Sequence, residues 1–122
     1  MNNGNYKIEG NTIYFQNGKS LNFDYSIKES RLLIIDRIMI ITLEIPQGIE
    51  YPNNVFAANF NGDLLWRINV SIEDLFYKSS KNFIFIGSAI NRNGDLVLFN
   101  WNDTAFVVNY LTGEVISKYN SK

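Results

Sequence analysis

Catalysis in this chain would have to rest on carboxylates, tyrosines, lysines or a backbone site. The 122 residues contain no cysteine and no histidine. Those two counts exclude a disulfide framework, a Cys–His zinc site, a cysteine nucleophile, a Ser-His-Asp triad and an imidazole base within the chain. Glu73 and Asp74 are adjacent carboxylates, but neighbouring side chains diverge on a helix or a strand and form no evident dyad. We expect the protein not to be an enzyme; a hydrolase with two carboxylates about 5–10 Å apart is the enzymatic alternative.

Two turn sequences come closest to a ligand pattern. Residues 59–63 read Asn-Phe-Asn-Gly-Asp and residues 91–95 read Asn-Arg-Asn-Gly-Asp, so side-chain oxygens stand at positions 1, 3 and 5, as in the beginning of a calcium loop. Neither copy has the later bidentate glutamate or the entering helix, and Asn-Gly-Asp is also a common hairpin tip. We interpret both as turns, and we expect no metal and no cofactor.

Composition predicts one globular domain spanning residues 1–122. Hydrophobic residues make up 46% of the chain, aromatic residues 15% and charged residues 19%, a mixture that a disordered chain does not have. The formal net charge is −1 and the sequence pI is about 5.3. A nucleic-acid-binding protein usually carries a basic stripe and a high pI, so we expect no nucleic-acid partner.

The charges are segregated along the chain. Residues 44–77 hold five acids and one base, and residues 93–117 hold three acids and no base. Lys78, Lys81 and Arg92 lie between these two stretches. Such runs are either ordinary solvated faces or an acidic patch that faces a basic partner, and the sequence leaves both readings open.

Turn signals rich in Asn and Gly recur every few residues and separate short apolar runs, which is typical of an antiparallel meander. A short helix is predicted over residues 71–77, with Ser71 as its cap, and residues 31–35 are either a strand or a bend. The predicted strands are residues 6–9, 12–16, 21–28, 38–45, 54–60, 64–70, 83–90, 96–101, 105–110 and 115–119.

The strand patterns predict burial. In residues 64–70 the side chains of Leu64, Trp66, Ile68 and Val70 share one apolar face. Residues 83–90, 96–101 and 105–110 are instead apolar on both faces. Such strands are either sandwiched between layers or expose an apolar patch, and we favour the layered arrangement.

An internal repeat shapes the predicted architecture. Residues 59–64 recur at 91–96 with five of six positions identical, and residues 111–115 form a degenerate third copy. A period in this range is typical of propeller blades, but a closed ring needs at least four blades of four strands. We therefore predict an all-β fold of about 8–10 short strands, in open twisted sheets that resemble partial propeller blades, with at most one short helix. Its terminal strands would have unpaired edges, where a partner or a second copy could dock.

Aromatic side chains offer one alternative function. Trp66 lies on the apolar face of its strand and is expected in the core, whereas Trp101 ends a strand beside Asn102 and Asp103 and is expected to be accessible. An exposed ring could stack on a sugar, so a carbohydrate-binding module remains an alternative, as does a structural β domain that pairs into a homodimer through its edges.

The N-terminus lacks the basic and apolar regions of a signal peptide, and the uncharged run at residues 38–43 is far shorter than the roughly 20 residues of a membrane span. We expect a cytoplasmic protein that does not contact a membrane.

One stretch resembles a recurrent pattern of small bacterial proteins. It reads Asn54-Val55-Phe56-Ala57-Ala58-Asn59-Phe60-Asn61-Gly62-Asp63-Leu64-Leu65-Trp66-Arg67-Ile68, and Gly94-Asp95-Leu96 and Thr112-Gly113-Glu114-Val115 extend it. This pattern resembles immunity proteins encoded beside toxins of contact-dependent growth inhibition and related polymorphic toxin systems. The resemblance covers residues 38–119, and its Gly-x-Leu-x-Trp element is shared with quinoprotein-type propeller blades.

The resemblance implies that the protein binds the C-terminal toxin domain of its own system and occludes the active site. Many such toxins are nucleases with basic clefts, which an acidic patch would suit. Contact residues cannot be carried over, so the candidates rest on charge and position alone. The predicted partner-binding residues are Asp63, Glu73, Asp74, Asp95 and Asp103, with Trp101 as an aromatic anchor.

Overall fold

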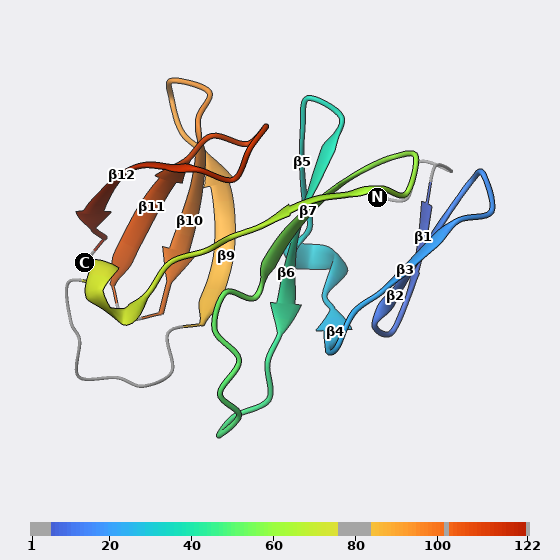
Figure 1. The fold of residues 1–122 in the computed structure, drawn as a ribbon, viewed down its shortest axis with the longest axis horizontal. Coiled ribbons are helices and arrows are strands. Elements are labelled where there is room, and N and C mark those ends of the chain that lie inside the picture. Colours follow the sequence, from blue (N-terminus) through green and yellow to red (C-terminus); the bar gives the residue numbers. More distant parts are fainter. Residues whose placement is uncertain (1–5, 76–83, 102, 122) are drawn as a thin grey trace.

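The computed structural model describes residues 6–75, 84–101 and 103–121. These residues form twelve strands in three antiparallel sheets. Figure 1 shows the sheets one after another along the long axis, the blue N-terminal sheet at one end and the orange and red C-terminal sheet at the other. The described part closes into no barrel, which confirms the predicted class of open antiparallel meander.

The N-terminal sheet has the order β1 (Tyr6–Glu9), β2 (Thr12–Phe15) and β3 (Ser20–Asn22). Its inner side chains are buried against the next sheet. Its outer face is polar, and Lys7 and Glu9 form an ion pair of 2.9 Å there. This sheet therefore ends the stack with a face suited to water.

The central sheet contains β4 (Ser26–Ile27), β5 (Leu33–Ile35), β6 (Ile38–Glu44), β7 (Val55–Asn59) and β8 (Leu64–Arg67). The short strands β4 and β5 pair with opposite ends of β6 and together fill one strand position. The strand order continues through β7 to β8, which forms an edge of the sheet.

The C-terminal sheet has the order β12 (Val115–Asn120), β11 (Thr104–Val108), β10 (Leu96–Asn100) and β9 (Phe85–Ile90). Its inner face packs on the central sheet. The cross-strand registers place two uncharged rows on its outer face. These rows are Gly87, Phe99, Ala105 and Tyr119, and Ala89, Val97, Val107 and Ser117.

The hydrophobic core has two halves that share the central sheet. Alternate residues of β6 and β7 contribute to each half: Ile40 belongs to the half under the C-terminal sheet, and Ile41 to the half under the N-terminal sheet. Strands β6 and β7 are thus the sandwiched pair, whereas the sequence placed such strands in residues 83–110. Those C-terminal strands pack on a described sheet through one face only, although Val97 and Ala105 on their other face are also buried.

The segment 31–35, left open between strand and bend, is mainly a strand. A 3₁₀ turn, η1 (Glu29–Arg31), precedes β5, which pairs back on β6. The connection runs through Asp36 and Arg37, both at positive φ (48° and 65°), as a two-residue type I′ hairpin requires. The predicted strand at 21–28 is in fact two strands in different sheets, β3 and β4.

The predicted helix over 71–77 is a single 3₁₀ turn, η2 (Ile72–Asp74), and its last two positions lie outside the described residues. Neither helical turn in the described part of the chain has the length or the apolar character needed to span a membrane. The apolar face predicted for residues 64–70 is buried at Trp66, Ile68 and Val70, but Leu64 is exposed because a bulge shifts the register beside it.

The 32-residue repeat marks a turn type and not a structural unit. In both copies the side-chain oxygen of the first Asn accepts the backbone N–H groups of the third and fifth residues, at 2.9–3.0 Å. These oxygens serve the hairpin, in agreement with the interpretation as turns. However, residues 59–63 join β7 to β8, whereas residues 91–95 join β9 to β10. The turn between β11 and β12, where the degenerate copy at 111–115 lies, is the counterpart of 59–63 in the next sheet.

Candidate functional site

The structure does not bring the six predicted residues together. Asp95 precedes β10 and Asp103 follows it, so the two lie at opposite ends of that strand. The backbone N–H of Ser121 donates to the carbonyl of Asp103 at 2.8 Å. Trp101 follows the last residue of β10 and is 55% exposed, as its sequence position predicts.

Asp63 is committed to the fold. Its carboxylate accepts a charged hydrogen bond of 2.8 Å from Lys19 and another of 3.2 Å from Asn59. These bonds, that to Lys19 first, hold the pKa of Asp63 below its usual value. The contact joins the last hairpin of the N-terminal sheet to the corresponding hairpin of the central sheet, and the Asn17 amide adds a bond to the carbonyl of Asn61.

Glu73 and Asp74 lie on η2, beside β12. The Asp74 carboxylate accepts the backbone N–H of Ser71 at 2.8 Å, so Asp74 and not Ser71 provides the side-chain cap. Lys118 donates from Nζ to the Asp74 carbonyl at 2.6 Å. Lys118 contacts η2, and Ser121, three residues further on, contacts the β10–β11 turn at Asp103. Thus η2 and the β10–β11 turn lie at the same end of the C-terminal sheet. Glu73, Asp74, Trp101 and Asp103 therefore gather at that end, and Asp63 and Asp95 lie elsewhere.

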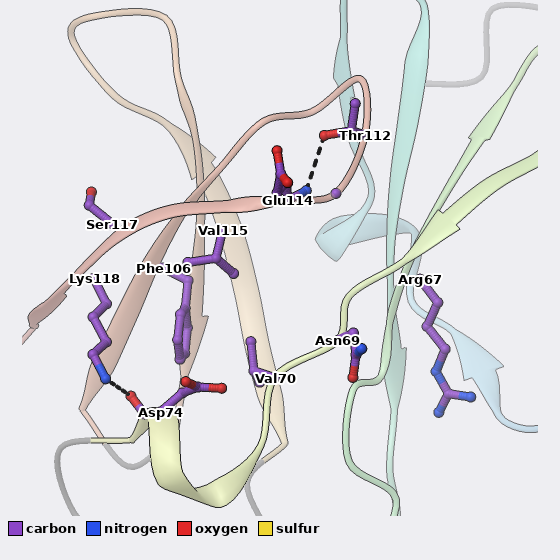
Figure 2. Close-up of a pocket in the computed structure, with 11 residues that line it drawn as sticks. Arg67, Asn69, Val70, Asp74, Phe106, Thr112, Glu114, Val115, Ser117 and Lys118 are labelled. Carbon is purple, nitrogen blue, oxygen red and sulfur yellow. Dashed lines mark hydrogen bonds between the residues drawn. The ribbon is translucent and has the colours of Figure 1, made fainter.

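A hollow of about 750 Å³ opens between the central and C-terminal sheets. Its walls are residues 67–74, which continue β8, and the segment from the β11–β12 turn into β12. Figure 2 shows Phe106 and Val115 at its apolar floor, with Asp74 at one border and Glu114 at the other. The hollow thus has two carboxylates and the ammonium group of Lys118 around an apolar floor, which suits a ligand that carries both charged and apolar parts.

Two smaller hollows continue along the same strand. One, of about 390 Å³, lies over Pro52, Asn53 and Asn69, and the other, of about 160 Å³, borders the N-terminal sheet at Asp24. Arg67 lines all three. The hollowed side of the molecule therefore follows β8, the edge of the central sheet, from the first sheet to the last.

The guanidinium of Arg67 is held on the side that faces the N-terminal sheet. It lies 5.0 Å from the ring centre of Tyr51 and 4.9 Å from that of Phe56, a cation–π arrangement. It also donates to the carbonyls of Asn53 and Pro52 at 2.8 and 3.0 Å. In Figure 2 its side chain extends away from the 750 Å³ hollow. The cation thus stabilises the loop before β7, and Lys118 is the cation turned toward the 750 Å³ hollow.

Tyr51 borders the smallest hollow. Its hydroxyl donates to the Asp24 carboxylate at 2.7 Å. Burial, followed by this bond, raises the pKa of the Tyr51 phenol. Tyr51 is therefore protonated at neutral pH and acts as a donor, not as a base.

Sequence reasoning missed this site because its residues carry no motif. Arg67 counted only as the one base of an acidic stretch, and Glu114 only as part of a degenerate repeat. The useful signal was strand alternation: Arg67 and Asn69 share the polar face of residues 64–70, next to the turn sequence Pro52-Asn53-Asn54. Among the described residues no group of three or more carboxylates could hold a metal ion.

Fold and site together define an antiparallel β protein of three stacked sheets, with a hollowed surface along the edge of the middle one. The chain belongs to the family described as a domain of unknown function (DUF7957), whose model matches residues 3–119. Neither the comparison with curated proteins nor the comparison with solved structures found a match.

Proposed function

We propose that the protein binds the toxin domain of its own contact-dependent or polymorphic toxin system and neutralises it by covering the active site. In this role the chain works in the cytoplasm, performs no reaction and needs no cofactor. Its partner is a protein, and neither nucleic acid nor membrane is contacted directly.

One observation carries the proposal: the hollowed side along β8 has three carboxylates and two cations at its borders. Asp74 and Glu114 border the large hollow and Asp24 the smallest. Arg67 and Lys118 are both hydrogen-bonded to backbone carbonyls. Three carboxylates thus stand against the two cations Arg67 and Lys118, and this small excess of negative charge supports a basic partner such as a nuclease with a basic cleft.

The physical demands of neutralisation fit such a surface. An inhibitor must bind before the toxin acts, and opposite charge raises the association rate by orders of magnitude at low salt. Occlusion requires a rigid, shaped surface and no reactive group. Two core halves that share one sheet supply that rigidity.

The experiment is capture of partners from the protein's own host by the tagged full chain, followed by determination of their mass. We expect one stoichiometric basic polypeptide of toxin-domain size that is released only by denaturant. The control is the same chain carrying Gly113→Val, a substitution that drives a side chain into the Trp66 ring and should unfold the chain. Recovery of the folded chain alone, or equal capture by both baits, would contradict the proposal.

A homo-oligomerising structural domain is the second candidate, and the outer face of the C-terminal sheet favours it. Its two register rows carry no charged side chain, in contrast to the Lys7–Glu9 face at the other end of the stack. Within these rows Val97 and Ala105 are buried, and Tyr119 at the edge strand is 45% exposed, so Tyr119 is the side chain that a second copy would cover. Sedimentation of the wild type and of Tyr119→Lys would test it: a dimer that the variant dissolves supports self-association, and a monomer at all concentrations excludes it.

A further inference from the structure

The edge of the central sheet at residues 64–70 has backbone groups that point away from the sheet. The N–H of Ile68 donates to the carbonyl of Val55, so Ile68 faces inward in the antiparallel ladder. Two residues on, the backbone groups of Val70 also point inward. There the Asn53 side chain takes the place of a strand partner: its oxygen accepts the Val70 N–H at 3.0 Å, and its nitrogen donates to the Val70 carbonyl at 3.2 Å. By alternation, the N–H and carbonyl groups of Arg67 and Asn69 point outward.

A strand laid along this edge would find space for its side chains on both sides. Successive side chains of a strand point to opposite faces. One row would enter the 750 Å³ hollow, and the other would lie over the hollows of about 390 and 160 Å³. An edge with no strand partner among the described residues, with hollows on both of its faces, resembles the arrangement by which proteins bind extended peptides.

The charges select the occupant. The 750 Å³ hollow has Asp74 and Glu114 at its borders over the apolar floor of Phe106 and Val115. Lys118 also lines it, with its Nζ held at the Asp74 carbonyl. A lysine or arginine at every second position would reach these carboxylates along an apolar stem. We infer that the edge at Arg67 and Asn69 takes an extended basic segment of the partner polypeptide as an additional strand. This inference rests on the proposed function in that the partner is a basic protein.

A peptide library tests the edge without knowledge of the toxin. Random decapeptides displayed on phage are panned against the full chain, and the dissociation constants of enriched peptides are measured with two variants. Asn69→Pro removes the outward N–H and leaves the inward bonds of Ile68 and Val70, whereas Asn69→Ala keeps the N–H. We expect lysine or arginine at alternate positions of the enriched peptides. We expect Asn69→Pro to weaken binding about tenfold, as loss of a backbone hydrogen bond and a steric block predict, and Asn69→Ala to change it less than about twofold.

The role of charge is tested with Glu114→Gln, which should weaken the binding of the same peptides. The control is Glu9→Gln on the outer face of the N-terminal sheet, which should leave their binding unchanged. If Asn69→Pro does not fold, hydrogen exchange of the wild type decides: the Arg67 and Asn69 amides should become protected on peptide binding. Failure to enrich any peptide, equal binding by the two Asn69 variants, or unprotected amides would overturn the inference.

The two proposals fail separately. If a toxin captured from the host binds Asn69→Pro as tightly as Asn69→Ala, the inference of strand addition at this edge is wrong, and the proposed neutralising function is unaffected. Peptides that bind the edge, together with no captured toxin, support the edge and overturn the function.

Discussion

Asn54 holds both backbone polar groups of Phe85. Its side-chain oxygen accepts the Phe85 N–H at 2.7 Å, and its nitrogen donates to the Phe85 carbonyl at 2.9 Å and to the carbonyl of Leu43 at 2.9 Å. Asn54 and Phe85 are both buried. One side chain therefore joins the central sheet to the first strand of the C-terminal sheet, where it replaces a missing strand partner.

Replacing Asn54 by alanine should destabilise the protein by about 3 kcal/mol. The substitution leaves the Phe85 N–H and two carbonyls without their partner in a dry interior. Urea unfolding followed by circular dichroism measures the change. Asn93→Ala, in an exposed turn, is the control and should stay within about 0.5 kcal/mol of the wild type. Equal midpoints for the two variants would mean that Asn54 does not join the sheets.

Gly113→Ala should cost much more stability than Gly94→Ala. Both glycines have φ near +80°, so both substitutions pay the left-handed backbone cost of about 1 kcal/mol. A Cβ at Gly113 would also lie 2.6 Å from the Trp66 ring, whereas one at Gly94 meets nothing within 4 Å. We expect the free energy of unfolding, measured in urea, to fall by about 3 kcal/mol for Gly113→Ala and by about 1 kcal/mol for Gly94→Ala. Similar losses would contradict the packing of the β11–β12 turn on Trp66.

Thr42→Val should stabilise the fold. Thr42 is 1% exposed, and its hydroxyl has no hydrogen-bond partner among the described residues. Valine keeps the shape and removes an unsatisfied polar group, for a gain of about 1 kcal/mol. Thermal unfolding measures it, and a lower melting temperature for the variant would show that the hydroxyl is satisfied in solution.

The Lys19–Asp63 ion pair should make a small contribution to folding stability, and this contribution should disappear in acid. The pKa of Asp63 is lowered in the folded state, so the folded chain binds fewer protons than the unfolded chain in acid. This stabilisation is present above the ordinary carboxyl pKa of 3.8 and is lost as the pH falls through the folded-state value. Asp63→Asn should therefore lower the melting temperature at neutral pH and match the wild type in strong acid. A difference that stays constant with pH would contradict the pairing.

Glu114→Lys should slow association with the captured partner about tenfold at low salt, because the charge borders the large hollow. Glu9→Lys, on the far face of the N-terminal sheet, should leave the rate within about twofold. Added salt should shrink the difference as screening increases. Stopped-flow or surface-based kinetics measure the rates, and equal rates would place the interface away from the hollow.

Local sequence patterns were sufficient to predict the type of most elements. Period-two alternation and Asn-Gly turns were sufficient for the hairpin of β1 and β2 and for the burial of Trp66. The type I′ turn at Asp36 and Arg37 was not predictable, because arginine rarely adopts positive φ. Leu64 was misplaced because a bulge shifts the register by one residue, and the bulge depends on the paired strand.

The candidate site was less accessible to sequence reasoning because charge is visible in a sequence and pairing is not. Asp63 was selected as an exposed acid, yet its partner Lys19 stands 44 residues earlier. Asn53 and Asn54 were taken as turn residues, whereas their amides bind Val70 and Phe85, 17 and 31 residues away. Such contacts arise only when the sheets stack.

Neutralisation itself is the most direct test. The C-terminal domain of the captured polypeptide is expressed from a regulated promoter in a test bacterium, with the wild-type chain or with Gly113→Val at matched abundance. We predict that the domain stops growth by itself, that the wild type restores growth at equimolar amounts, and that the variant does not. Growth that the wild-type chain fails to restore would contradict the proposed function.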